Sequence, residues 1–231
     1  MVFYDLYGLP GAGKSTLANI IISELRAKGY KVGTWDDVYY RCPNVIFKQS
    51  LKREMLFHIN EYKLFFWCWK AYKNCKNPNQ TFYKRLLRLT HQLLMVSKEN
   101  NYDIVILEEG AIQFISSLRF LEDLSDDNDY QRISHYLNKK LLINPVFCNI
   151  DIAESMSRVK NREYGSERRF SYRIGAEKFK QAMIFKEKSL RKISSTFAPP
   201  IEINMKAPVA DNARLLVTEI LSRSLDERNK T

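Results

Sequence analysis

The sequence predicts an α/β fold in which a five-stranded parallel sheet is covered by helices on both faces. Three observations predict it: short apolar runs alternate with longer helical patterns, a glycine-rich loop joins the first strand to the first helix, and acidic residues follow several strands. Such alternation is typical of βαβ units, whose right-handed crossovers bring the carboxyl ends of the strands to one edge. Ligands bind beyond that edge.

The first strand is predicted at residues 2–7, where β-branched and aromatic side chains are enriched. Residues 8–15 read Gly-Leu-Pro-Gly-Ala-Gly-Lys-Ser and fill every position of the phosphate-binding P-loop pattern, which predicts a P-loop NTPase fold. In this motif backbone N–H groups face phosphate oxygens, the lysine reaches the β- and γ-phosphates, and the serine hydroxyl holds Mg²⁺. We therefore assign nucleotide binding to Gly8, Leu9, Pro10, Gly11, Ala12, Gly13, Lys14, Ser15 and Thr16.

A helix is expected next, over residues 15–28, because apolar residues recur at helical spacing and Gly29 provides a stop. Residues 31–34 with Trp35 predict the second strand, which ends at Asp36 and Asp37. Residues 46–100 carry long helical patterns rich in aromatic and basic side chains. They predict a helical insertion.

The later elements continue the alternation within a single domain spanning residues 1–231. Strands are predicted at 103–107, 145–150 and 201–205. Helices are predicted at 112–121, 130–141, 152–162, 176–194 and 209–224.

Cysteine usage and hydropathy bear on the compartment. The four cysteines form no CxxC pair, and the three histidines are scattered, which argues against zinc and for reduced, mostly buried thiols. Asp5 interrupts the first apolar stretch, and no apolar run is long enough to cross a bilayer. We expect a cytoplasmic protein that does not associate with membranes.

The net charge of +11 has three candidate causes. Anionic substrates favour a basic cleft, nucleic acid favours a broad basic surface, and a lysine-rich exterior needs no ligand at all. The charge alone does not choose among them.

The stretch GLPGAGKSTLA, the following LRAKGYKV and the acidic pair at 36 and 37 resemble the small P-loop kinases. These include nucleoside and nucleotide kinases and the adenylylsulfate, shikimate and gluconate kinases. The similarity covers the first 40 residues by their letters and the remainder by the order of elements. It implies an ATP-dependent kinase that uses Mg²⁺ and transfers the γ-phosphoryl group to a small metabolite or a nucleotide-like acceptor.

The resemblance also implies roles for the acids that follow the strands. An acid after the second strand contacts the acceptor hydroxyl in this group, and either Asp36 or Asp37 matches it; the alternative is an ordinary turn. Glu108 matches the Walker B acid that holds Mg²⁺, where aspartate is usual, and Glu109 is a candidate for substrate binding. Kinases of thymidylate and deoxynucleosides place an arginine beside this acid. This chain has no arginine next to Glu108, which argues against a nucleoside acceptor.

Small P-loop kinases bind their acceptor where the insertion of residues 46–100 lies, and they close an arginine-bearing lid over ATP; the resemblance implies that residues 152–172 form this lid region. Arg158 and Arg162 share one helix face in the lid region and are expected to neutralise charge during transfer, with Arg168 and Arg169 following. The alternative for Arg158 is a surface ion pair with Glu154. Further candidates are Arg53 for the acceptor and Lys206, by position, for the adenine ring.

Two other functions are compatible with these patterns. The basic and aromatic helices also fit a kinase of nucleic acid ends or an RNA-associated NTPase, although this partner is not favoured. The long helices also fit a non-enzymatic module switched by nucleotide, but the chain lacks the Asn-Lys-x-Asp pattern of guanine recognition. The motifs leave open ATP or GTP as donor, and the oligomeric state.

Overall fold

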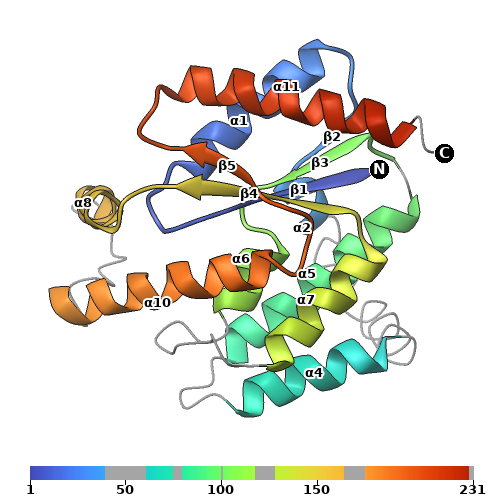
Figure 1. The fold of residues 1–231 in the computed structure, drawn as a ribbon. Helices are drawn as coiled ribbons and strands as arrows, with labels where there is room; N and C mark the ends of the chain where they lie inside the picture. The colour runs from blue at the N-terminus through green and yellow to red at the C-terminus, as the bar shows by residue number, and fades with distance from the viewer. Residues whose placement is uncertain (40–60, 75–79, 100, 118–127, 164–174, 229–231) are drawn as a thin grey trace.

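The computed structural model describes residues 1–39, 61–74, 80–99, 101–117, 128–163 and 175–228 (Figure 1). These residues form one five-stranded sheet in the order β2-β3-β1-β4-β5, and every pairing is parallel. The strands are β1 Val2–Tyr7, β2 Val32–Gly33, β3 Ile104–Leu107, β4 Ile143–Asn149 and β5 Ile201–Asn204. The predicted α/β fold class is confirmed.

Helices cover both faces of the sheet (Figure 1). One face carries α1 (Lys14–Ala27) and α11 (Val209–Arg228), which pack on each other. The other face carries α4 (Tyr62–Lys73), α5 (Gln80–Glu99), α6 (Ala111–Ser117), α7 (Asn128–Lys140) and α10 (Ala176–Ser194). The two remaining helices, α2 (Trp35–Tyr39) and α8 (Ile152–Glu163), follow β2 and β4 directly.

Alternation along β1 divides the hydrophobic core into two layers. Phe3 and Tyr7 belong to the layer shared with α4 to α7, whereas Tyr4 and Leu6 belong to the layer shared with α1 and α11. Successive side chains of a strand point to opposite faces, so a central strand covered on both sides is apolar almost throughout. Asp5 is the exception, and it is completely buried.

The chief departure from the predicted elements is at the second strand. β2 contains only Val32 and Gly33, and Trp35 begins α2 instead of extending the strand. The physical reason is a capping interaction at Thr34, described below. The strand predicted to begin at Pro145 begins at Ile143, and the helix predicted to reach residue 121 ends at Ser117, as far as the described residues go.

The helical insertion is described in part. α4 and α5 confirm helices within residues 46–100, whereas residues 46–60, including Arg53, lie outside the described part of the chain. Of the four cysteines, Cys68 and Cys148 are buried as expected, and Cys42 and Cys75 lie outside that part. Within the described residues, every helix is too short or too polar to cross a bilayer.

Candidate active site at the carboxyl edge of the sheet

The predicted phosphate loop connects β1 to α1. Gly13 adopts a left-handed backbone conformation and caps α1, which begins at Lys14, one residue earlier than predicted. The Lys14 Nζ atom donates hydrogen bonds to the carbonyl oxygens of Gly8 and Leu9, each at 3.3 Å. The ammonium group therefore lies across the loop, at the amino end of a helix whose dipole favours anions.

Two glycines of this loop are required by close packing. A Cβ atom at Gly8 would lie 2.6 Å from the carbonyl oxygen of Cys148 in β4. A Cβ atom at Gly11, where φ is +79°, would lie 3.1 Å from the carbonyl oxygen of Ser155 in α8. The loop is thus packed between β4 and α8, and only glycine fits at these contacts without strain.

Helix α8 is fixed directly to the phosphate loop. The Ser155 hydroxyl donates a 2.6 Å hydrogen bond to the carbonyl oxygen of Pro10, and Ser155 is fully buried. Sequence reasoning missed this residue because one serine within an amphipathic helix carries no recognisable pattern. The contact positions the lid region beside the site predicted for phosphate.

Arg158 lies on the same helix, and the Cβ position of Gly11 is 3.3 Å from the Arg158 Cβ. Its guanidinium donates to the Glu154 carboxylate at 2.5 Å and to the Met205 carbonyl oxygen at 3.4 Å. The ion pair considered as the alternative is therefore present, and it places Arg158 beside the phosphate loop. Arg162 lies one turn further along α8, but its side chain, like residues 164–174 with Arg168 and Arg169, is outside the described part.

The loop after β5 reaches the same edge. A Cβ at Gly13 would lie 3.3 Å from the Cε of Met205. Lys206, the candidate for adenine contact, is ion-paired with Asp151 after β4, and the carboxylate raises the pKa of Lys206. Both side chains are more than half exposed, so the pair is a solvated contact at the rim of the predicted nucleotide site.

The two aspartates that follow β2 have different surroundings. Thr34 caps α2: its Oγ1 accepts from the N–H of Asp37 at 3.2 Å, and the Asp37 carboxylate accepts from the N–H of Thr34 at 2.8 Å and from its hydroxyl at 2.9 Å. This reciprocal arrangement is a capping box. The carboxylate of Asp37 is thus engaged in local structure, whereas Asp36 is exposed.

The acids after β3 lie at the same edge as the phosphate loop. Leu107 pairs with Asp5 of β1, which places Glu108 beside the last residues of β1 before Gly8. Glu108 is partly buried and Glu109 is exposed. Among the described residues no group of three or more histidine, cysteine or acidic side chains could hold a metal. A hydroxyl at Ser15 with one carboxylate at Glu108 instead suits Mg²⁺, which usually keeps waters and binds phosphate oxygens.

Two buried ionisable residues contact α6, the helix that follows Glu108 and Glu109, and neither was among the predicted site residues. The Asp5 carboxylate accepts a 2.9 Å hydrogen bond from the N–H of Ile112, and burial raises its pKa to about 7. Lys186 of α10 is 2% exposed, and burial lowers its pKa to about 7. Asp5 is recognisable in retrospect as the one charge within an apolar strand. Lys186 is one of several lysines in a basic helix, and nothing in the sequence distinguishes it.

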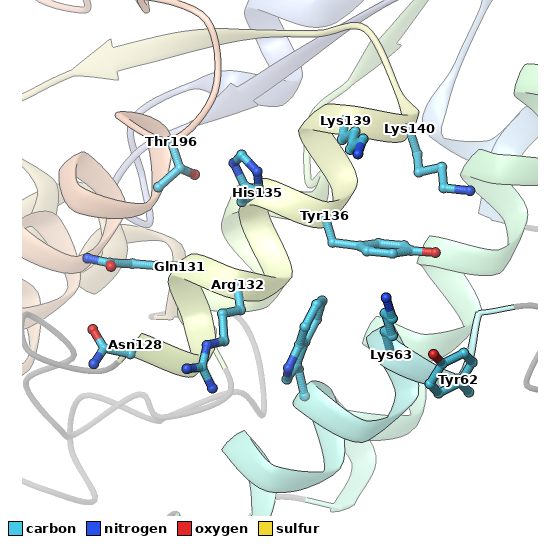
Figure 2. Close-up of a pocket in the computed structure, with 11 residues that line it drawn as sticks. Tyr62, Lys63, Asn128, Gln131, Arg132, His135, Tyr136, Lys139, Lys140 and Thr196 are labelled. Atoms are coloured by element: carbon cyan, nitrogen blue, oxygen red, sulfur yellow. The ribbon is translucent and has the colours of Figure 1, made fainter.

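A separate hollow of about 960 Å³ lies between α4 and α7 (Figure 2). Its lining is basic and aromatic and comes from α4, α7 and Thr196, so it includes no residue of the phosphate loop. Lys63 and Lys140 lie next to the Tyr136 ring in Figure 2, and Lys140 Nζ is 5.7 Å from the ring centroid. The Tyr136 ring meets Trp67 edge-on at 5.9 Å between ring centroids. The hollow is therefore not the predicted catalytic cleft.

Comparison with solved structures identifies the fold. The chain is similar to deoxyadenosine kinase from M. mycoides with the products dCMP and dCDP, at 18% identity and a TM-score of 0.52 over 96% of this chain and 100% of that one. It is also similar to the same enzyme with bound dATP, at 18% identity and a TM-score of 0.50 over 95% and 99%. No protein-family model and no curated protein matches the sequence. This likeness shows that the chain has the fold of these structures.

Proposed function

We propose that this protein is an ATP-dependent kinase that transfers the γ-phosphoryl group of Mg-ATP to a hydroxyl or phosphate oxygen of a small, nucleotide-like acceptor. The observation that carries the proposal is the phosphate loop before α1, in which Lys14 Nζ donates hydrogen bonds to the carbonyl oxygens of Gly8 and Leu9. The P-loop kinase architecture supports it. The fold alone is compatible with other P-loop chemistry, so the assay below must detect transfer.

Each step has a candidate group. Backbone N–H groups of the phosphate loop bind the phosphates, and Lys14 moves from the carbonyl oxygens to the β- and γ-phosphates. Ser15 and Glu108 would hold Mg²⁺, which supplies positive charge to the bridging and γ-phosphate oxygens. Asp36 is the better candidate for orienting the acceptor, since Asp37 is engaged in capping.

Transfer then forms one bond and breaks one. The acceptor oxygen bonds to the γ-phosphorus, and the bond from that phosphorus to the β–γ bridging oxygen breaks, which releases ADP. When the acceptor is a hydroxyl, its proton passes to the Asp36 carboxylate. Arg158 would leave Glu154 to neutralise charge on the transferred group, since guanidinium suits paired contacts with phosphate.

A transfer assay with labelled Mg-ATP and a panel of nucleosides, nucleotides and other hydroxylated metabolites tests the proposal. Lys14→Ala should lower transfer at least about 100-fold, the scale on which a charge-stabilising group contributes. Lys28→Ala is the matched control because Lys28 is exposed just beyond the same helix. Full activity of Lys14→Ala, or no transfer to any acceptor by the parent protein, contradicts the proposal.

A nucleic acid end is the second candidate acceptor, and the hollow between α4 and α7 is the observation that favours it. Its lysines and arginine, with aromatic rings among them, suit a phosphate backbone and stacked bases. Two of these cations already have acidic neighbours: Arg132 lies 3.5 Å from Asp129 and Lys140 lies 3.7 Å from Glu61. Binding of single-stranded DNA or RNA that weakens steeply with salt supports this acceptor. No binding at low salt removes it.

A further inference from the structure

The short helix α6 follows the acidic turn directly. This turn consists of Glu108 and Glu109, which follow the last residue of β3, and of Gly110; α6 then begins at Ala111. Any movement of α6 therefore moves the two acids with it. Both ends of this helix contact a buried ionisable side chain from a distant part of the chain.

Asp5 holds the beginning of α6. Its Oδ2 atom accepts from the N–H of Ile112 at 2.9 Å, and the N–H groups of Gly110 and Ala111 also stabilise its charged form, which opposes the rise in its pKa. Asp5 leaves no space for a side chain at position 110, where a Cβ would lie 2.4 Å from the carboxyl carbon. The turn is thus fixed against β1, three residues before the phosphate loop begins.

Lys186 holds the end of α6. Its Nζ atom donates to the Ser116 hydroxyl at 2.6 Å, to the Ser117 hydroxyl at 2.7 Å and to the Gln113 carbonyl oxygen at 3.4 Å. Lys186 belongs to α10, the first described helix after the predicted lid region, and α10 packs along α6. The lysine therefore connects α6 to α10, which also contacts α8.

The signs of the two groups match the helix. In its charged form Asp5 places a carboxylate at the amino end of α6, where the helix dipole is positive, and Lys186 in its charged form places an ammonium at the carboxyl end, where the dipole is negative. Burying two ionisable groups lowers the stability of the fold, and apolar side chains of similar size in their place often leave a protein equally or more stable. Directional hydrogen bonds, in contrast, fix where the helix lies.

We propose that Asp5 and Lys186 are positioning residues that hold α6, and with it the Glu108–Glu109 turn, in a fixed place relative to the phosphate loop and α10. This inference rests on the proposed function, in which Glu108 contributes to Mg²⁺ binding. The two residues act through α6 and do not touch the nucleotide.

Calorimetric titration of the full chain with ATP, with and without Mg²⁺, tests this role. The readout is the ratio of the two ATP affinities, which a purely structural role does not change. Lys186→Met and Asp5→Asn should each lower this ratio about tenfold, as loss of groups that orient metal ligands commonly does. Asp5 and Lys186 both interact electrostatically with Lys14, but this interaction changes the ATP affinity with and without Mg²⁺ alike and therefore cancels in the ratio.

Lys180→Met is the matched control, since Lys180 is an exposed lysine on the same helix α10. Thermal unfolding of each variant establishes that it is folded, and if one of the two fails to fold, the other decides the test. Folded variants that keep the parent ratio overturn the inference and leave the proposed function intact. A parent protein that binds no Mg-ATP overturns both.

Discussion

The phosphate loop and the acidic turn lie at the same edge of the sheet but are built in opposite ways. The phosphate loop is a run of consecutive residues whose glycines and lysine contact one another and the adjacent backbone. The acidic turn is held by Asp5, 107 residues from its partner Ile112, and by Lys186, 70 residues from Ser116. The first is local and visible in the sequence, and the second exists only once the chain has folded.

Substitution of glycine gives the largest expected effect, and it separates the two regions. Gly8→Ala places a methyl group 2.6 Å from the backbone oxygen of Cys148, and it should lower the free energy of unfolding by about 3 kcal/mol. Gly110→Ala meets the Asp5 carboxyl group, which can rotate, and should cost about 2 kcal/mol.

Urea unfolding measures both effects. Gly29→Ala is the control because no atom lies within 4 Å of its Cβ position, and its positive φ of 88° alone should cost about 1 kcal/mol. Equal losses for Gly8→Ala and Gly29→Ala would show that backbone conformation, and not the close contact at Gly8, determines the cost.

The two aspartates after β2 give the next largest effect and sharpen the distinction between support and chemistry. Asp37→Ala removes the acid of the capping box and should lower the free energy of unfolding by about 1 kcal/mol. Asp36→Ala should leave stability within about 0.5 kcal/mol and lower the rate of transfer instead. Urea unfolding and the transfer assay together distinguish the roles. An Asp36→Ala variant with full activity assigns the acceptor contact elsewhere.

Asp5 and Lys186 should also make the free energy of unfolding depend on pH. The pKa of Asp5 rises from 3.8 to about 7 on folding, so its contribution to stability is present below pH 4 and is lost as the pH rises to 7. The pKa of Lys186 falls from 10.5 to about 7, so its contribution is present above pH 10.5 and is lost as the pH falls to 7.

Unfolding free energies measured across pH 4 to 10 in the parent, Asp5→Asn and Lys186→Met proteins test these signs. Asp5→Asn should remove a decline in stability on the acid side of pH 7, and Lys186→Met should remove a rise on the basic side. Superimposable pH profiles for all three proteins would mean that neither group titrates differently on folding.

The smallest expected effect concerns α8. Glu154→Gln removes the ion pair with Arg158, whose two side chains are 38% and 36% exposed, and should change stability by less than about 0.5 kcal/mol. Because it frees the guanidinium, nucleotide affinity should increase slightly, which a titration with Mg-ATP would measure. Weaker binding would indicate that Glu154 holds Arg158 in its binding position.

The fold was predictable because each strand is a short apolar run and each crossover is a helix with clear periodicity. The phosphate loop was predictable because its function demands particular residues at particular spacing. The position of Trp35 at the start of α2 was not predictable, since a capping box at Thr34 and Asp37 overrides strand propensity. Lys186 and Ser155 were not, because their partners are distant in sequence and their own segments contain no unusual residue type.

The carboxylates illustrate an intermediate case. Parallel topology correctly brought Glu108 to the edge where β1 meets the phosphate loop, because all strand ends converge there. Topology did not distinguish Asp36 from Asp37, since that difference depends on which carboxylate reaches back to the N–H of Thr34. Their place in the mechanism stays a prediction until the variants are measured.

The central claim, that the turn after β1 binds a nucleoside triphosphate, is tested most directly by calorimetry. Titration of Mg-ATP into the parent protein and into Lys28→Ala should give matching binding heats and a higher unfolding temperature. Lys14→Ala should lose both responses while it remains folded. A parent protein that shows neither heat nor thermal protection with saturating Mg-ATP or Mg-GTP would contradict the account.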